Sequence, residues 1–203
     1  MADSAARIVL VRHGEIAANA ARIWHGSTDS ELTERGQLQA GRVAEHLALR
    51  EPRPVALYVS PLRRTRATAA PIAARLGLEL RLEPGLREYG IGELEGVSYD
   101  DLMREHRFFE RIAQDPGFAP PGGESPREVI ARVRDALERI ARAHRGEQAI
   151  VVSHGAALGF TLGTLIDRDS TQWHRYHLAN CAVSELVLEP EPRLLSWNST
   201  DHL

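Results

Sequence analysis

Three short apolar runs in the sequence are each followed by residues that could bind an anion. These residues are Arg12 and His13 after the run 8–11, Arg63, Arg64 and Arg66 after Ser60, and His154 and Gly155 after the run 149–153. Guanidinium groups and the free amides at helix N-termini both attract phosphate-like anions. If the three runs are neighbouring strands, their ends form one anion-binding site.

Two other kinds of catalytic site are weaker interpretations of the same residues. Ser153 beside His154 suggests a serine hydrolase, but no serine lies in the G-x-S-x-G turn of that class. His13, His154 and a carboxylate could bind zinc. However, Arg12 would set a positive charge against the ion, and no H-E-x-x-H motif is present. We therefore expect an anion site without a bound metal.

All 25 cationic residues of the 203-residue chain are arginines. The lack of lysine excludes Schiff-base chemistry, including that of pyridoxal phosphate enzymes, and it excludes a P-loop lysine. Any bound phosphate must therefore be held by arginine, histidine and backbone amide groups.

Composition and charge exclude several classes of partner. The chain is 43% hydrophobic and 26% charged, with a formal net charge of −3 and no basic block, which argues against nucleic acid and membrane surfaces. It has neither a run of about eighteen apolar residues nor a secretory leader. The lone Cys181 cannot form an intrachain disulfide, which indicates a reducing, cytoplasmic location. We expect a small-molecule partner, and a homodimer stays open.

Strand-like and helical patterns alternate along the chain. Strands are predicted at 7–11, 55–60 and 149–153, with weaker candidates at 78–82, 182–188 and 194–197. Helices are predicted at 33–49, 61–77 and 125–146, and after His154. This alternation predicts an α/β fold, in which residues 1–203 form a single three-layer domain with a mostly parallel central sheet and helices on both faces. Ligands of such sheets bind beyond the carboxyl ends of the strands.

Two of the helices carry detailed signals. The helix that follows Thr33 is predicted to place Leu38, Val43 and Leu47 on its inner face. The helix that begins at Ser125 has a capping box completed by Glu128.

Residues 89–123 interrupt the alternation, since this segment is polar, contains glycines and ends in "APPGG". We predict a lid-like excursion over the active site rather than a separate domain. Its larger side chains include Tyr89, Met103, Phe108 and Phe109, which would either contact substrate or pack the lid itself.

Six segments, in order, resemble those of the histidine phosphatase superfamily, in the branch that includes cofactor-dependent phosphoglycerate mutase and small phosphatases. They are "RHGE" with Asn19 six residues beyond His13, "GSTDSELTERGQLQA" from Gly26, "SPLRRTRATAA" from Ser60, "LREYGIGELEG" from Leu86, "PPGGES" from Pro120 and "VVSHG" from Val151. One short motif would be weak support, but six in the family order cover most of the chain.

The resemblance implies a role for each matched residue. His13 is the nucleophile that becomes phosphorylated, and Glu88 donates the proton to the leaving group. The expected phosphate-binding residues are Arg12, Arg64, His154 and Asn19, with backbone amides near Gly155 and Ala156. The expected substrate-binding residues are His25, Gly26 and Tyr89.

The resemblance also implies a function, a metal-independent and cofactor-free phosphatase that hydrolyses a small phosphomonoester through phosphohistidine. A mutase that needs 2,3-bisphosphoglycerate is the alternative, although "REYGIGELEG" resembles the phosphatase version of its segment. An inactive phosphate-binding module would usually lack the nucleophile or the acid. Ile16 stands where the family usually has a hydroxyl residue, and His25 where its phosphatases often have glutamine. Both departures leave the substrate open.

Overall fold

The computed structural model describes residues 5–203, which build one six-stranded sheet in the order β3-β2-β4-β1-β5-β6. The strands are β1 Arg7–Arg12, β2 Ala56–Val59, β3 Leu80–Leu82, β4 Gln148–Ser153, β5 Val183–Val187 and β6 Arg193–Ser199. The four strands from β3 to β1 pair in parallel, whereas β5 runs antiparallel to both β1 and β6. The predicted mostly parallel sheet is confirmed.

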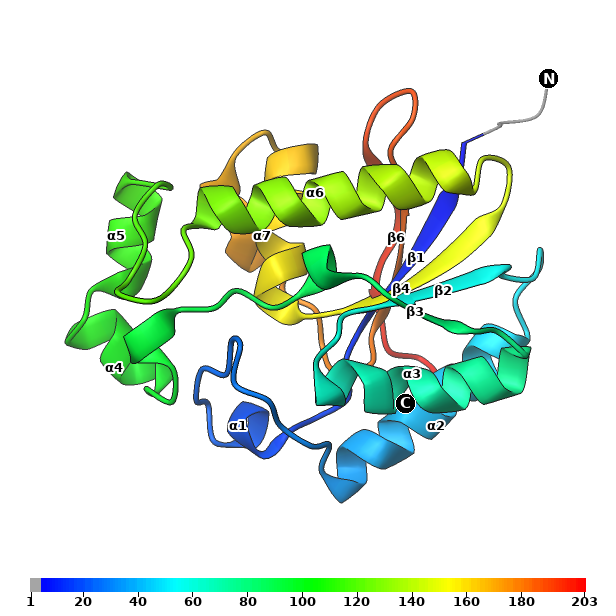
Figure 1. Cartoon of the computed structure of the whole chain (residues 1–203), viewed down its shortest axis with the longest axis horizontal. Helices are drawn as coiled ribbons and strands as arrows, with labels where there is room; N and C mark the ends of the chain where they lie inside the picture. Colours follow the sequence, from blue (N-terminus) through cyan, green and yellow to red (C-terminus); the bar gives the residue numbers. More distant parts are fainter. Residues whose placement is uncertain (1–4) are drawn as a thin grey trace.

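Two layers of helices cover the sheet, one on each face (Figure 1). Helices α2 Glu34–Ala48 and α3 Arg63–Leu76 cover one face, and α6 Pro126–Ala143 and α7 Gly155–Ile166 cover the other. Side chains of β1 alternate between two buried apolar clusters, with Ile8 and Leu10 on the α6–α7 side and Val9 and Val11 on the α2–α3 side. Burial on both faces explains why this strand is apolar throughout.

The helix starts follow the sequence signals closely. The Thr33 side chain accepts a hydrogen bond from the Gly36 amide, and Ser125 and Glu128 form the predicted capping box. The expectation for Leu38 is wrong, because its side chain is 67% exposed while Val43 and Leu47 are fully buried. At 100° per residue, Leu38 lies about 140° around the helix from Val43 and so cannot share its face.

A 3-10 helix, η1 Pro84–Leu86, follows β3 and precedes the excursion. The excursion, residues 89–123, contains η2 Gly92–Leu94, α4 Tyr99–Arg104 and α5 Phe108–Gln114. Helices α4 and α5 lie beyond the sheet (Figure 1). A short α1, Ala17–Ala20, follows β1, and a 3-10 helix, η3 Ser170–Tyr176, follows α7. No helix among residues 5–203 is long and apolar enough to cross a bilayer.

Stacked aromatic rings join the excursion to the rest of the molecule. Tyr99 stacks on Phe109, Phe109 on Trp173 of η3, and Trp173 on Phe160 of α7, with centroid distances of 6.1, 5.7 and 5.0 Å. Phe108 is completely buried, whereas Met103 is 59% exposed. Phe108 and Phe109 therefore pack the excursion, and its action as a lid stays a prediction.

Candidate active site

A small cavity of about 30 Å³ lies beyond the carboxyl end of β1, next to the start of α7. The residues proposed for chemistry that line it are Arg12, His13, Asn19, His25, Glu88, Gly155 and Ala156, and the remaining walls are Ile16, Ile23, Trp24, Tyr99, Trp173 and His177. Strand ends far apart in the sequence thus meet at one point, where a parallel sheet places its ligands.

The imidazole of His13 is fixed in one tautomer. Its Nδ1 lies 2.7 Å from the carbonyl oxygen of Gly14. Because a carbonyl can only accept, Nδ1 carries the proton and Nε2 keeps its lone pair. Burial, together with Arg12 and Arg64, holds the pKa of His13 well below its ordinary value, so that the ring is neutral at pH 7. A buried neutral imidazole with one free nitrogen is a competent nucleophile.

The guanidinium of Arg12 has a buried donor without a partner. Its Nη1 donates to the carbonyl oxygen of Leu178 at 2.6 Å, but its Nε makes no hydrogen bond among the described residues. A Cβ at Gly155 would lie 3.2 Å from that Nε, which is tighter than an ordinary van der Waals contact, so glycine leaves room for the guanidinium. An unpaired buried donor of a cation is costly in free energy. Arg12 is therefore suited to an anion in the cavity.

Arg64 and His154 lie behind His13, and both are completely buried. The Arg64 Nε donates to His154 Nδ1 at 3.2 Å, so His154 carries its proton on Nε2, which donates to the Ser60 hydroxyl at 2.7 Å. The rings of His13 and His154 meet edge to face with centroids 5.2 Å apart. Burial, Arg64 and His13 lower the pKa of His154. Direct contact of Arg64 or His154 with a phosphoryl group stays a prediction, because their hydrogen bonds here go to protein atoms.

A short loop holds the guanidinium of Arg64. Its Nη2 donates to the carbonyl oxygen of Gly26 at 2.7 Å and its Nη1 to that of Thr28 at 2.8 Å. Gly26 passes so close to the next segment that a Cβ would lie 2.3 Å from the Tyr89 carbonyl oxygen. Glu95 accepts hydrogen bonds from the amides and hydroxyls of Ser27 and Thr28, which lower its pKa although burial opposes this shift.

The carboxylate of Glu88 sits at the N-terminus of α7. Its Oε1 accepts hydrogen bonds from the amides of Tyr89 at 2.8 Å and Ala157 at 2.7 Å, and its Oε2 accepts from Ala156 at 3.2 Å. The helix dipole and free amides favour a negative group at this position. The sequence predicted that the Ala156 amide binds phosphate, whereas in the structure it binds Glu88.

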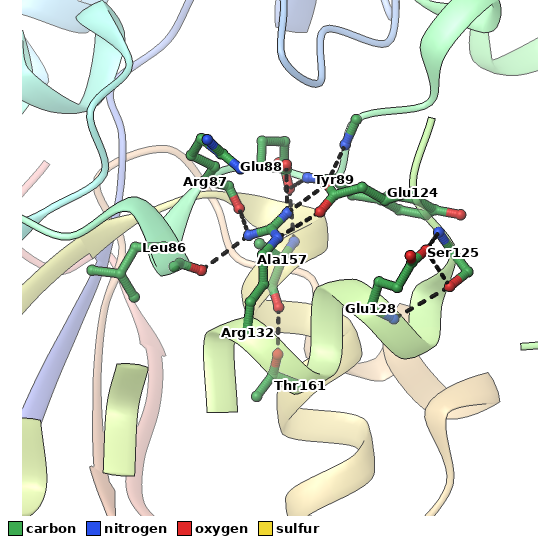
Figure 2. A network of polar contacts seen from close by, with 12 residues as sticks. Leu86, Arg87, Glu88, Tyr89, Glu124, Ser125, Glu128, Arg132, Ala157 and Thr161 are labelled. Atoms are coloured by element: carbon green, nitrogen blue, oxygen red, sulfur yellow. Dashed lines mark hydrogen bonds and ion pairs between the residues drawn. The ribbon is translucent and has the colours of Figure 1, made fainter. Parts of the chain in front are cut away.

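One arginine of α6 holds the segment that carries Glu88 (Figure 2). The Arg132 Nη1 donates to the carbonyl oxygens of Gly85 and Arg87 at 3.0 and 2.6 Å, and its Nη2 donates to that of Glu88 at 2.9 Å. Its Nε and Nη2 also bind both carboxylate oxygens of Glu124 at 2.7 and 2.8 Å. Glu124 belongs to the "PPGGES" motif, which thus takes part in positioning Glu88. Arg132 was not predicted from the sequence, although an arginine that follows this motif on a predicted helix is a signal for such a role.

Two asparagines fix each other beside His13. The Asn19 Oδ1 accepts from the Ile16 amide at 3.2 Å and from the Asn180 Nδ2 at 3.0 Å, which leaves the Asn19 NH₂ group for the cavity. Asn180 also donates to the carbonyl oxygen of His13 at 3.0 Å. Asn180 and the cavity-lining His177 were not predicted, because the "HLANC" segment carries no catalytic motif.

The three predicted substrate-binding residues have different positions. His25 lines the cavity and bonds to the Ser30 hydroxyl at 2.7 Å. Gly26 contributes its carbonyl to Arg64 instead of to the cavity wall. The expectation for Tyr89 is wrong: its ring is completely buried, edge to face against Trp24 and Phe160. Because Glu88 faces the cavity, its neighbour Tyr89 faces the core.

No group of three or more histidine, cysteine, aspartate or glutamate side chains in residues 5–203 is placed to hold a metal ion. The positive groups around His13 are arginines, and they suit a phosphate.

Comparisons with known proteins agree with this chemistry. The chain is 39% identical over 192 residues to the probable phosphoglycerate mutase GpmB of Photorhabdus laumondii, covering 94% of this chain and 88% of that protein. It is 36% identical over 203 residues to a metal-independent phosphoserine phosphatase of Arabidopsis thaliana, covering 97% and 82%.

Solved structures share the whole fold. Phosphoserine phosphatase from Entamoeba histolytica, in complex with 3-phosphoglyceric acid, superposes with a TM-score of 0.86 at 28% identity, covering 98% of this chain and 99% of that one. A mycobacterial glucosyl-3-phosphoglycerate phosphatase gives a TM-score of 0.84 at 28% identity, covering 97% and 100%. A model of the histidine phosphatase superfamily (branch 1) matches residues 8–200. The chain therefore belongs to the histidine phosphatase superfamily, as its motifs predicted.

Proposed function

We propose that this protein is a metal-independent phosphatase that hydrolyses a small phosphomonoester through a phosphohistidine at His13. The observation that carries the proposal is the state of His13, a neutral ring whose Nδ1 proton is bound to Gly14 and whose Nε2 is free in a cavity beside Arg12. Relatives named as phosphatases over nearly the whole chain support the same reaction.

The reaction proceeds in two transfers. In the first, the lone pair of His13 Nε2 attacks phosphorus, the bond from phosphorus to the ester oxygen breaks, and the leaving oxygen takes a proton from Glu88. In the second, water attacks the phosphohistidine, its proton passes to the Glu88 carboxylate, and the phosphorus–nitrogen bond breaks. The products are an alcohol and inorganic phosphate, and both side chains return to their starting forms.

The cations of the site stabilise the charge on the transferred group. Phosphoryl transfer depends mainly on positioning and on neutralising the equatorial oxygens. Arg12 lines the cavity, and its Nε has no partner among the described residues, so we assign to it a hydrogen bond to the phosphoryl group. Arg64, one residue layer behind, adds positive charge and keeps His13 neutral before the attack.

Glu88 serves as the acid once substrate is bound. A phosphate dianion and a carboxylate in one small cavity repel each other, which favours a proton on the carboxyl group. That proton is then available to the leaving oxygen. After the first transfer, the amides of Ala156 and Ala157 stabilise the resulting carboxylate.

A phosphoglycerate mutase is the second candidate, and the 39% identity to the probable mutase of Photorhabdus laumondii favours it. A mutase would return the phosphoryl group from His13 to another hydroxyl of the substrate, and it would have to exclude water. Ile16 lines the cavity with an apolar side chain where this family usually has a hydroxyl. We therefore infer that hydrolysis dominates.

One assay series separates these functions. We expect p-nitrophenyl phosphate to be hydrolysed equally with and without excess EDTA, while a metal-dependent phosphatase assayed in parallel loses its activity. We also expect phosphate release to exceed interconversion of 3- and 2-phosphoglycerate in the presence of 2,3-bisphosphoglycerate. Loss of activity in EDTA that zinc or magnesium restores would contradict the metal-independent site, and a mutase rate well above the hydrolysis rate would favour the second candidate.

A further inference from the structure

The cavity at His13 is too small for a whole substrate. Its volume is about 30 Å³, a tenth of the volume of about 300 Å³ of the space beside it. It can therefore receive little more than the phosphoryl group. The remainder of any substrate must lie in a neighbouring space.

A second cavity of about 300 Å³ adjoins the first. The residues that line both are Arg12, Asn19, Tyr99, Trp173 and His177, and the second cavity adds Arg22 and Asn180. Because the two spaces share so much of their walls, a molecule with its phosphoryl group at His13 extends naturally into the second one.

The second cavity has the chemistry of an anion site. Its lining contains two arginines, a histidine and two asparagines, and among the described residues that line it there is no carboxylate. The rings of Tyr99 and Trp173 supply apolar walls. Binding sites of this kind combine apolar contact with a few polar groups that fix the orientation of the ligand.

Arg22 and His177 are available to a ligand. The Arg22 Nη2 lies 3.5 Å from an oxygen of Asp100, and the two side chains are 71% and 61% exposed. Such an exposed and long ion pair contributes little and is easily exchanged. His177 is exposed and makes no hydrogen bond among the described residues. Neither side chain therefore has a strong protein partner to give up.

The backbone at Arg22 is held in an unusual conformation. Its φ is 55°, in the left-handed region that residues other than glycine rarely adopt. The carbonyl oxygen of Arg22 accepts a hydrogen bond of 2.9 Å from the Tyr99 amide at the start of α4. The surrounding structure thus fixes the point from which the Arg22 side chain extends.

We propose that Arg22 and His177 bind a second anionic group, a carboxylate or a second phosphate, on the non-reacting part of the substrate. The preferred substrate is then a small phosphomonoester that also carries such a group, with its carbon skeleton between Tyr99 and Trp173. This inference rests on the proposed function, because it needs the phosphoryl group at His13.

A neighbouring groove supplies a matched control. This wider space, of about 820 Å³, shares Arg12, His177 and Asn180 with the second cavity. It also contains Arg35, which pairs with the carboxylate of Glu15, and the exposed Arg42. It lacks the Tyr99 and Trp173 walls. If the remainder of the substrate lay there instead, Arg42 would take the role of Arg22.

The test compares O-phosphoserine with O-phosphoethanolamine, which differ by one carboxylate. We expect Arg22→Gln to lower kcat/KM for phosphoserine about tenfold or more relative to phosphoethanolamine, as the loss of a charge-assisted hydrogen bond predicts. His177→Gln should shift the ratio in the same direction, and Arg42→Gln should leave it unchanged. The ratio of kcat/KM for propane-1,3-diol bisphosphate to that for propane-1,3-diol monophosphate measures the preference for a second phosphate. Comparison with the ratio for phosphoserine and phosphoethanolamine shows whether a second phosphate is preferred to a carboxylate.

Equal losses on both substrates, or a selective loss in Arg42→Gln alone, would overturn the assignment of the second cavity. Calorimetric titration of both compounds into the wild type and Arg22→Gln gives a readout that does not need turnover. If the wild type hydrolyses nothing, the proposed function fails, and the anion site is judged by binding alone. Weaker binding of phosphoserine confined to Arg22→Gln supports it, and unchanged binding refutes it.

Discussion

Arg132 donates a 2.9 Å hydrogen bond to the backbone carbonyl oxygen of Glu88, which ties the longest helix of the protein to the segment that carries the proposed acid. The same guanidinium binds the carbonyl oxygens of Gly85 and Arg87 and the carboxylate of Glu124. Arg132 is not among the described residues that line the cavity, so it acts on the reaction through the position of Glu88.

Loss of Arg132 should therefore weaken acid catalysis specifically. We predict that Arg132→Gln lowers the rate with an alkyl phosphate about 10²-fold, the cost of a small misplacement of a catalytic group, and lowers it less with p-nitrophenyl phosphate. Arg132→Lys should recover only part of the activity, because the ammonium group of lysine cannot reproduce the planar set of N–H donors of the guanidinium. The exposed Arg134, which pairs with Glu138 one turn away, gives the control Arg134→Gln. Equal losses on both esters at unchanged thermal stability would contradict this positioning role.

Substitution of Glu88 itself should lower the rate by a larger factor, which again depends on the leaving group. Glu88→Ala removes the proton donor, so we expect a loss of about 10²–10⁴-fold in the single-turnover phosphorylation rate with an alkyl phosphate. The nitrophenolate of p-nitrophenyl phosphate leaves almost without a proton, and its loss should be much smaller. Glu93→Ala alters an exposed glutamate of the same segment and serves as the control. If Glu88→Ala slows both substrates equally, Glu88 acts by electrostatics or positioning instead.

We predict that loss of Arg64 affects all substrates alike. In the proposed mechanism Arg64 acts on the phosphoryl group, which every substrate carries, and on His13, which attacks every substrate. For Arg64→Met we predict a loss of about 10²–10³-fold with either ester. The neighbouring Arg63 is 68% exposed in its side chain and gives the matched variant Arg63→Met. Thermal unfolding must accompany the assay, because Arg64→Met also leaves the carbonyl oxygens of Gly26 and Thr28 without a donor. A folded variant with full activity would exclude a role for Arg64.

The buried histidines predict how stability depends on pH. Burial and the nearby arginines lower the pKa values of His13 and His154, whereas in the unfolded chain both titrate near their ordinary value of about 6.5. Below that pH the two histidines bind protons in the unfolded chain but stay neutral in the folded protein. The stabilisation is therefore complete above about pH 6.5 and is lost as the pH falls, by up to about 1.4 kcal/mol per pH unit for each histidine.

Urea unfolding at pH 7.5 and 5.5 (about one unit on either side of that value) checks this prediction. His154→Gln should lose less stability between these pH values than the wild type, while a variant of the exposed His174, His174→Gln, should match the wild type. A loss as large in His154→Gln as in the wild type would assign the pH dependence to other groups.

Some residues of this site could be predicted from the sequence, because their function requires a particular residue type directly after a strand with a recognisable pattern. His13, Arg64 and His154 follow strands that are apolar because they are buried on both faces, and that pattern is local in sequence. The capping box at Ser125 is local too. Such features can be read from a few adjacent residues.

The missed features depend on contacts between distant segments. Asn180 is 167 positions from His13, and Arg132 is 44 from Glu88, so no local pattern links them. Tyr89 was misplaced because two adjacent residues of a matched motif face opposite sides, one the cavity and the other the core. Leu38 is apolar but lies on the exposed side of α2, because the face that a helical residue occupies depends on its angle around the helix and not on its hydrophobicity.

The central claim, a phosphohistidine at His13, is tested most directly by trapping the intermediate. Enzyme mixed rapidly with a radiolabelled phosphate ester and quenched in denaturant should carry a label that survives alkali and is lost in acid, because protonation of the imidazole makes it a good leaving group. The label should be absent in His13→Ala and present in His174→Ala. A label that survives acid but not alkali, as an acyl phosphate on Glu88 would, or one that persists in His13→Ala, would contradict the account.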